Sequence, residues 1–374
     1  MTQSTIIASI ATFLTLTFAG TAAQAASPSS PSGVIVNRGV VELETLGSAG
    51  ISVRIAEDLA DIIDDGATRR VVPVVGAGSL QNITDLKLLR GIDMAIAQID
   101  ALDFVRERGL FPGIENSVSY ITRLYNEEFH LLVRREIGSI TDLANRKVNV
   151  GPRAGGTAIT AGRLFDLLKI PVTITTDNQE VALEKLRSGE IAAMAFVSGR
   201  PAPLLAGVTK NDGLNLLAIP FNSAVGAAYL PARLTSTDYP ALISPDHPVN
   251  TVAVGSVLLA ADLQQATERQ RNVANFVDAF FTGFQALLTP GHHSKWQEVN
   301  LTADVPGWRR YGPADDWLKR NVQVAAAPSA DELKSMFARF VDERRQANGG
   351  APMRPDEKED LFQQFQRWQT GSQH

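Results

Sequence analysis

The sequence contains no cysteine among its 374 residues. This absence excludes disulfides, thiol catalysis and a lipid anchor attached to a lipobox cysteine. The five histidines are scattered and form no His-Glu-x-x-His motif and no cluster with metal-ligand spacing. A Gly-x-Ser-x-Gly nucleophile elbow is also missing. We therefore expect no metal, no cofactor and no catalytic residues. These absences argue against an enzyme.

Positive charge is not in excess either, because the net charge is −5 and no lysine- and arginine-rich run is interleaved with aromatics. A nucleic-acid surface is therefore not expected.

One long apolar run occurs, over residues 6–22, and Ala23-Gln24-Ala25 after it fits a small-residue cleavage site. This pattern predicts a secretory signal peptide over residues 1–25, although the segment before the run has no lysine or arginine. A retained membrane anchor is the alternative, but the run is short for a membrane span. Residues 26–36 read as a flexible Ser/Pro-rich leader. We expect a periplasmic, soluble mature protein.

The rest of the chain alternates strand and helix patterns, which predicts an α/β fold with two lobes. The first lobe is predicted to be discontinuous, over residues 37–122 and 225–320, and the second to span 123–224. The chain would cross between lobes near Ile121–Arg135 and return near Thr251–Leu259. Residues 321–374 read as a helical C-terminal extension, with helices over 330–345 and 355–369.

Small or polar residues follow three successive predicted strands of the first lobe, at Ser48–Ser52, Gly78–Asn82 and Gln98–Asp100. Repeated strand–helix–strand units imply right-handed crossovers and a mostly parallel sheet, whose strand carboxyl ends share one edge. These loops should lie side by side and face the corresponding loops of the second lobe across a cleft.

A glycine-rich loop, Gly151–Thr157, joins a predicted strand to a predicted helix in the second lobe. Backbone N–H groups at a helix N-terminus carry partial positive charge and suit a carboxylate or phosphate. The motif is neither a dinucleotide fingerprint nor a P-loop, and a plain glycine turn is the alternative. Hydrogen-bond donors at strand ends, including Arg153 and Arg200, favour a site that binds a small anion over one that performs catalysis.

Several segments in order resemble the TAXI family, the solute-binding proteins of tripartite ATP-independent periplasmic (TRAP) transporters. They are Val74–Asn82 (VVGAGSLQN), Gly91–Asp100 (GIDMAIAQID), Leu124–Arg134 (LYNEEFHLLVR), Asp142-Leu143 with Lys147–Gly151, Gly155–Thr157, Gly189–Ile191 and Gly199–Pro201. The resemblance covers about Val40 to Leu259.

The resemblance implies a type II periplasmic-binding-protein fold that closes on its ligand like a clamshell. It also implies a small organic acid, such as glutamate or 2-oxoglutarate, that is delivered to a TRAP membrane permease. The expected ligand-binding residues, which include the two arginines, are Ser48, Gly50, Ser52, Ser79, Asn82, Gln98, Tyr125, Arg153, Gly155, Gly156, Thr157, Gly199 and Arg200.

This chain departs from the family pattern at two places. The first loop has no aromatic residue where family members often carry a Tyr-Tyr pair, so an aromatic wall over the ligand is missing. Arg153 and Arg200 stand where small residues are usual, which favours a second acidic group on the solute.

The sequence therefore predicts a monomeric receptor that binds a carboxylate or dicarboxylate between its lobes and closes around it. Three alternatives stay open. The same fold could serve an ABC importer or a sensor that feeds a membrane kinase, it could host an enzyme, or the tryptophan-rich helical tail could mark an envelope interaction protein.

Overall fold

The computed structural model describes residues 39–263, 266–321 and 334. The predicted signal peptide, the leader and nearly all of the predicted C-terminal extension lie outside these residues. In the described part of the chain, no helix is both long and apolar enough to cross a membrane.

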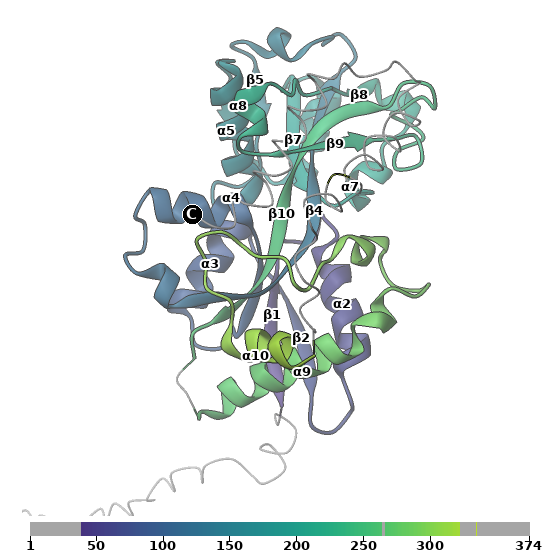
Figure 1. The fold of residues 1–374 in the computed structure, drawn as a ribbon. Coiled ribbons are helices and arrows are strands. Elements are labelled where there is room, and N and C mark those ends of the chain that lie inside the picture. Colours follow the sequence, from purple (N-terminus) through teal and green to yellow (C-terminus); the bar gives the residue numbers. More distant parts are fainter. Residues whose placement is uncertain (1–38, 264–265, 322–333, 335–374) are drawn as a thin grey trace, which may run out of the picture. The chain divides into compact units, whose positions relative to one another are not determined.

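The described strands form one ten-stranded sheet that runs through both lobes (Figure 1). The strands are β1 (Val40–Thr45), β2 (Arg70–Val75), β3 (Met94–Gln98), β4 (Val118–Arg134), β5 (Lys147–Asn149), β6 (Thr173–Thr175), β7 (Ala193–Ser198), β8 (Leu214–Leu216), β9 (Leu230–Leu234) and β10 (Val249–Ala261). Their main order is β2-β1-β3-β10-β4-β7-β5-β6, with β8 beside β4 and β9 beside β10.

Two long strands, β4 and β10, connect the lobes. They pair antiparallel with each other, from Ala253 opposite Glu128 to Ala261 opposite Val118. On one side β10 pairs with β3 of the first lobe, and on the other β4 pairs with β7 of the second. The remaining main pairs, β1 with β2 and β3, and β5 with β6 and β7, are parallel. The carboxyl ends of three parallel strands in each lobe therefore meet where the lobes meet.

The longer helices connect the strands and cover the sheet. They are α2 (Ser52–Ile63), α3 (Ser79–Leu88), α4 (Ile99–Glu107), α5 (Gly156–Leu168), α6 (Gln179–Ser188), α9 (Glu268–Leu287) and α10 (Gly312–Asn321). Two single turns, α7 (Pro203–Ala206) and α8 (Ser223–Gly226), and 3-10 turns at Ile114–Asn116, Ile140–Leu143, Lys210–Asp212 and Ser294–Glu298 complete the set.

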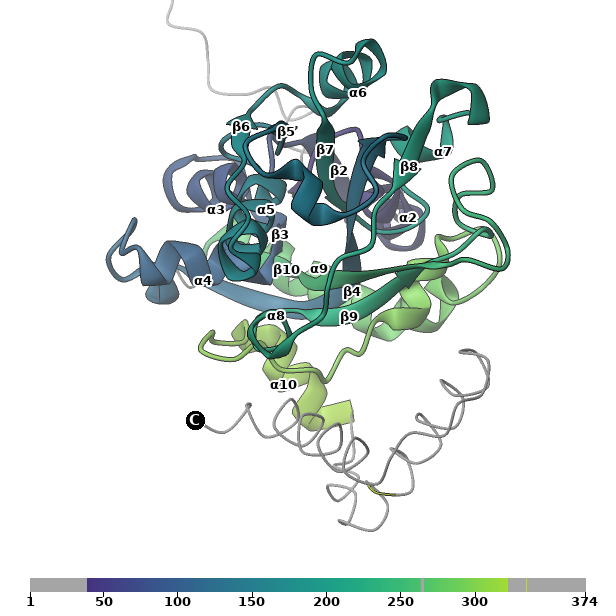
Figure 2. The same cartoon turned by 90° about the horizontal axis from the view of Figure 1, so that it is seen from above.

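The first-lobe core follows the alternation of a strand that is buried on both faces. Met94 and Ile96 of β3 pack with α2 and α9, whereas Ala95 and Ala97 of the same strand pack with α3 and α4. Figure 2 shows α3 and α4 on one side of β3 and β10, with α2 on the other. Trp296 is fully buried against Phe280 and Phe284 of α9.

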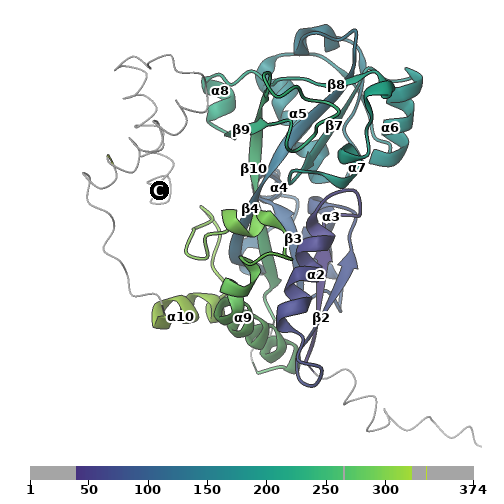
Figure 3. The ribbon, with the colours of Figure 1, turned by 90° about the vertical axis from the view of Figure 1, so that its right-hand side faces the viewer.

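The second lobe repeats this arrangement around β7. Ala193, Ala195 and Val197 pack against α5, whereas Met194 and Phe196 pack against α6 and α7. Figure 3 shows α5 and α6 on opposite sides of β7.

The predicted two-lobed α/β fold is confirmed. One boundary differs from the prediction, which assigns residues 225–320 to the first lobe, because residues 225–243 pack in the second lobe. Val225 and Tyr229 lie in the core cluster around α5, and Leu234, Tyr239 and Ile243 lie in the cluster around α6. Residues 99–100, which we expect in a loop after β3, form the start of α4 instead, and β9, which pairs along β10, is a strand that the sequence does not predict.

Candidate functional site

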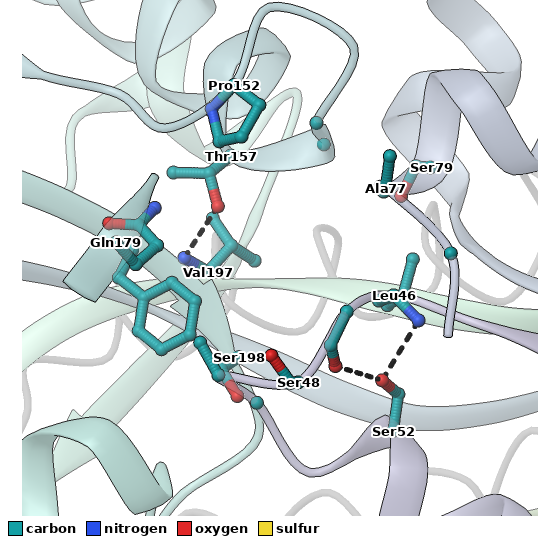
Figure 4. Close-up of a pocket in the computed structure, with 18 of the residues that line it drawn as sticks. Leu46, Ser48, Ser52, Ala77, Ser79, Pro152, Thr157, Gln179, Val197 and Ser198 are labelled. Atoms are coloured by element: carbon teal, nitrogen blue, oxygen red, sulfur yellow. Dashed lines mark hydrogen bonds between the residues drawn. The ribbon is translucent and has the colours of Figure 1, made fainter. Parts of the chain in front are cut away.

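A cavity of about 220 Å³ lies where the two sets of strand ends meet (Figure 4). The residues that line it come from the ends of β1, β2 and β3, from β4, and from the ends of β5, β6 and β7. They are Leu46, Gly47, Ser48, Ala49, Gly50, Ile51, Ser52, Val75, Gly76, Ala77, Gly78, Ser79, Gln98, Glu127, Pro152, Gly155, Gly156, Thr157, Asn178, Gln179, Glu180, Phe196, Val197 and Ser198. Eight of the predicted binding residues are among them: Ser48, Gly50, Ser52, Ser79, Gln98, Gly155, Gly156 and Thr157.

The loop between β1 and α2 is held by a buried hydroxyl. Gly47 takes a left-handed conformation (φ 110°), which only glycine adopts readily, and turns the chain back over the strand end. The Ser52 hydroxyl accepts a hydrogen bond from the Leu46 N–H at 2.9 Å. Ser52 is therefore engaged in the loop, whereas the hydroxyl of exposed Ser48 has no hydrogen bond to any described residue.

Buried polar side chains also fix the next two strand ends. The Ser79 hydroxyl accepts a hydrogen bond from the Gln98 N–H at 3.0 Å. The Asn82 amide donates to the carbonyls of Thr45 and Ile96, both at 2.9 Å. Asn82 was predicted to contact ligand, but it is completely buried behind the cavity and ties two strand ends together.

In the second lobe, the predicted glycine-rich loop leads directly into α5. A turn closes through the hydrogen bond from the Gly155 N–H to the Pro152 carbonyl at 2.8 Å, and Gly155 is the N-cap of α5. The Thr157 hydroxyl accepts a hydrogen bond from the Val197 N–H at 3.1 Å, which joins this helix to the end of β7 (Figure 4).

Two helix N-termini, one from each lobe, reach the cavity without a side-chain cap. They belong to α2, preceded by Ile51, and to α5, preceded by Gly155. By contrast, the Asn178 side chain caps α6, and the first turn of α3 is occupied by the Ala154 carbonyl of the other lobe, which accepts hydrogen bonds from the N–H groups of Leu80 and Gln81. The free N–H groups and helix dipoles of α2 and α5 suit an anion between them.

Glycines let the lobes approach closely around this cavity. A Cβ on Gly78 would lie 2.7 Å from the Gly155 Cα, and a Cβ on Gly50 would lie 2.8 Å from the Ser198 Oγ. A Cβ on Gly156 would lie only 1.6 Å from the Gln98 Oε1. Larger side chains at these positions would force the lobes apart.

Glu127 is the cavity residue with the most unusual electrostatics. It is 2% exposed, and its Oε2 accepts a hydrogen bond from the Gln98 Nε2 at 2.6 Å. Burial is the main reason that the pKa of its carboxyl rises to about 8, and the neighbouring charge of Glu128 raises it further. Sequence reasoning missed Glu127, although it lies in the quoted Leu124–Arg134 segment two residues after Tyr125.

Other lining residues that sequence reasoning missed are Asn178, Gln179 and Glu180, which follow β6. The rule that ligands bind at strand carboxyl ends would have found them if it had been applied to this predicted strand as well.

Four further predicted residues do not line the cavity. Tyr125 is completely buried, and Gly199 packs against Tyr125 and Ile51. Arg200 forms ion pairs with Glu128 (3.2 Å) and Asp238 (3.0 Å). Arg153 lies on a separate cavity between α4 and α5.

Neither arginine is therefore placed to bind a second acidic group in the central cavity. The described residues contain no group of three or more His, Asp or Glu side chains that could hold a metal ion.

Similar solved structures include the periplasmic binding protein BugD, at 12% identity and a TM-score of 0.47, with 70% of this chain and 88% of that chain covered. A TctC solute-binding protein from Polaromonas matches at 13% identity and a TM-score of 0.37, with 66% and 88% covered. A substrate-binding protein of an amino acid ABC transporter matches at 15% identity and a TM-score of 0.40, with 67% and 97% covered. Residues 48–269 match the NMT1-like family, a stretch that contains every residue lining the cavity except Leu46 and Gly47, and the chain therefore belongs to that family.

Proposed function

We propose that this protein is an extracytoplasmic receptor that binds a small organic acid between its lobes and presents it to a membrane transporter. The observation that carries this proposal is the pair of uncapped helix N-termini, of α2 and α5, that reach one cavity from opposite lobes. A carboxylate held by both would join the lobes, so ligand binding and lobe closure would be one event.

The solute is better matched by one carboxylate than by two. The residues that line the cavity include no lysine, arginine or histidine, so a second carboxylate would find no cationic partner among them. The cavity volume of about 220 Å³ also favours a small molecule.

Binding, rather than catalysis, fits the state of the cavity hydroxyls. Those of Ser52, Ser79 and Thr157 are engaged in hydrogen bonds that hold loops and strand ends. None is paired with a histidine that could act as a general base, in contrast to an activated nucleophile.

A TRAP permease of the TAXI type is our proposed partner, because the Val74–Asn82 and Leu124–Arg134 segments resemble that family. A receptor for an ABC importer or a sensor kinase is the alternative on the same fold. Transport assays with the reconstituted permease would distinguish them, since a TRAP system should transport the solute only with this receptor and an ion gradient, without ATP.

Export is proposed through cleavage after Ala25, to give a monomeric periplasmic protein. N-terminal sequencing of the purified periplasmic form is expected to begin at Ala26, and a start at Met1 would contradict the signal peptide. Light scattering on a size-exclusion column should give the monomer mass.

The decisive experiment is a thermal-shift screen of the mature chain against amino acids, oxoacids, hydroxyacids, dicarboxylates, sulfonates and phosphates. A ligand at a hundred times its Kd should add about 2.7 kcal/mol to the free energy of unfolding, a readily measured shift. A response confined to molecules without a carboxylate would overturn the proposed ligand class, and no response at all would overturn the receptor function.

A further inference from the structure

The ionisable side chains that line the central cavity are both acidic. They are Glu127, which is buried on β4, and Glu180, which is exposed in the first turn of α6. A cavity that binds a carboxylate through helix N-termini thus also contains a carboxyl group without a cationic partner in the lining. This combination suits a ligand that carries both a carboxylate and a hydrogen-bond donor.

Glu127 has one oxygen available. Its Oε2 is bonded to Gln98, but its Oε1 receives no hydrogen bond from any described residue. The Gln98 side chain is held in this orientation, because its Oε1 accepts a hydrogen bond from the Ser79 hydroxyl at 3.4 Å. Its amide therefore donates to only one of the two Glu127 oxygens. The Glu127 Oε1 is not among the completely buried atoms that lack a hydrogen bond, so a ligand group in the cavity can reach it and form that bond.

A second acceptor in the lining, on Gln179, also lacks a hydrogen bond within the described part of the chain. The Gln179 Nε2 donates to the Ala195 carbonyl at 3.2 Å, while its Oε1 is buried without a hydrogen-bond partner among the described residues. Apart from the exposed Ser48 hydroxyl, the unpaired side-chain groups named here are therefore acceptors, whereas the free groups of the α2 and α5 N-termini are donors.

The acidic group and the α5 N-terminus are close neighbours. The Gln98 side chain that donates to Glu127 lies directly against Gly156, where a Cβ would be 1.6 Å from the Gln98 Oε1. A ligand that reaches both must carry its donor only a short distance from its carboxylate.

We propose that Glu127 is the specificity-determining residue of this site and selects α-amino acids, by pairing with the 2-ammonium group while the α2 and α5 N-termini bind the 2-carboxylate. This inference rests on the proposed receptor function. The charge of the ammonium group would favour the ionised form of Glu127, so the two groups would form an ion pair in the complex. A 2-oxo acid offers no cation to this carboxyl group, and an unsubstituted acid offers it no hydrogen-bonding group at position 2.

Matched ligand sets test the inference in the wild-type protein. Each set keeps one carbon skeleton and changes position 2: L-glutamate, 2-oxoglutarate and glutarate, then L-leucine, 4-methyl-2-oxopentanoate and 4-methylpentanoate. Kd values from isothermal titration calorimetry at pH 7 are expected to favour the amino acid over its partners at least about tenfold in any set that binds. Equal or tighter binding of the 2-oxo or unsubstituted acid would overturn the inference and leave the receptor function standing. No binding in either set, together with a silent screen, would overturn both.

Two substitutions identify the residue. Glu127→Gln keeps the shape and should reduce amino-acid affinity at least tenfold while changing the affinity for the matching 2-oxo acid less than threefold. Glu184→Gln removes an exposed carboxyl group of α6 that lies outside the cavity lining and should leave the preference unchanged. An unchanged preference in Glu127→Gln, or its loss in Glu184→Gln, would contradict the assignment. If Glu127→Gln proves unstable, Glu127→Asp tests the same point, since it keeps the charge and should keep the order of preference.

Discussion

Single glycines determine how closely the lobes meet, and Gly156 is the most constrained of them. Gly156→Ala should reduce ligand affinity by at least a hundredfold, because the added Cβ would overlap the Gln98 Oε1 and displace either α5 or the Gln98–Glu127 pair. Calorimetric titration with the ligand found in the screen measures this effect.

Gly162 provides the matched control on the same helix. A Cβ there would meet nothing within 4 Å, and alanine has the higher helix propensity. Gly162→Ala should keep the affinity and add about 0.5–1 kcal/mol to the free energy of unfolding. Equal affinity in both variants would show that the cavity tolerates a shift of α5.

Asn82 shows why a polar residue after a strand is ambiguous in sequence. Its position predicted ligand contact, but its amide satisfies two strand-end carbonyls instead. Asn82→Ala should lower the free energy of unfolding by about 1–3 kcal/mol in urea titrations, since both carbonyls would lose their partner. Asn250→Ala, at an exposed asparagine, should change it by less than about 0.5 kcal/mol. A stable Asn82→Ala protein that no longer binds ligand would restore the original prediction.

Helices α4 and α5 are joined across the lobes by a buried carboxyl group. The Asp100 Oδ2 accepts hydrogen bonds from the Thr160 hydroxyl at 2.6 Å and from the Tyr229 hydroxyl at 3.2 Å. Burial is the main cause that raises the pKa of Asp100 to about 6. The nearby charge of Arg163 lowers this pKa, and that of Asp103 raises it. In separated lobes this aspartate would be exposed and titrate near its ordinary pKa of about 3.9.

The joined state thus holds a proton more tightly than the separated state between about pH 4 and 6. Joining of the lobes should become more favourable as the pH falls through 6, and less favourable as it rises. In the Glu127→Gln background, which removes the titration of Glu127, affinity for a ligand that does not itself titrate there should increase from pH 7 to pH 5, by less than tenfold per pH unit for one proton. Asp100→Asn should flatten this slope, whereas Asp166→Asn, at an exposed residue of α5, should keep it. The same slope after Asp100→Asn would assign the effect to another titratable group.

Element types could be predicted well because helices such as α2 carry clear apolar periodicity and strands such as β10 are continuous apolar runs. The predictions failed where contacts between distant segments determine whether a helix or a strand forms. The helix α4 begins at Ile99 without a loop after β3, and β9, a short strand of five residues, is held by its pairing with β10. For the site, the strand-end rule found the glycine loops, but the directions of Arg153 and Arg200 depend on partners such as Glu128 that sequence spacing does not reveal.

A largely buried ion network, centred on Glu128, connects both lobes of the molecule. Glu128 of β4 accepts from Lys295 of the first lobe at 2.6 Å and from Arg200 of the second at 3.2 Å. Lys295 is 2% exposed and also pairs with Glu298 at 2.8 Å. Removing one member leaves a buried charge without its partner.

Lys295→Met should lower the free energy of unfolding by about 3–5 kcal/mol in urea titrations at pH 7. Adding Glu128→Gln should recover part of that loss, because the second change removes the unpaired carboxylate. Lys319→Met breaks the exposed pair with Asp315 and should cost less than about 1 kcal/mol. Strict additivity of Lys295→Met and Glu128→Gln would show that the two side chains are not energetically coupled.

The returning strand β10 also has a consequence for how the chain folds. Ile96 of β3 pairs with Leu258, so the first lobe lacks the centre of its sheet until the whole second lobe has been synthesised. Contacts between residues so far apart in sequence form slowly. Before these contacts form, both faces of β3 stay exposed to solvent, although each later packs against a layer of helices. A newly made chain should therefore remain open for some time after leaving the ribosome, and in this interval the export proposed above could thread it across a membrane before it folds.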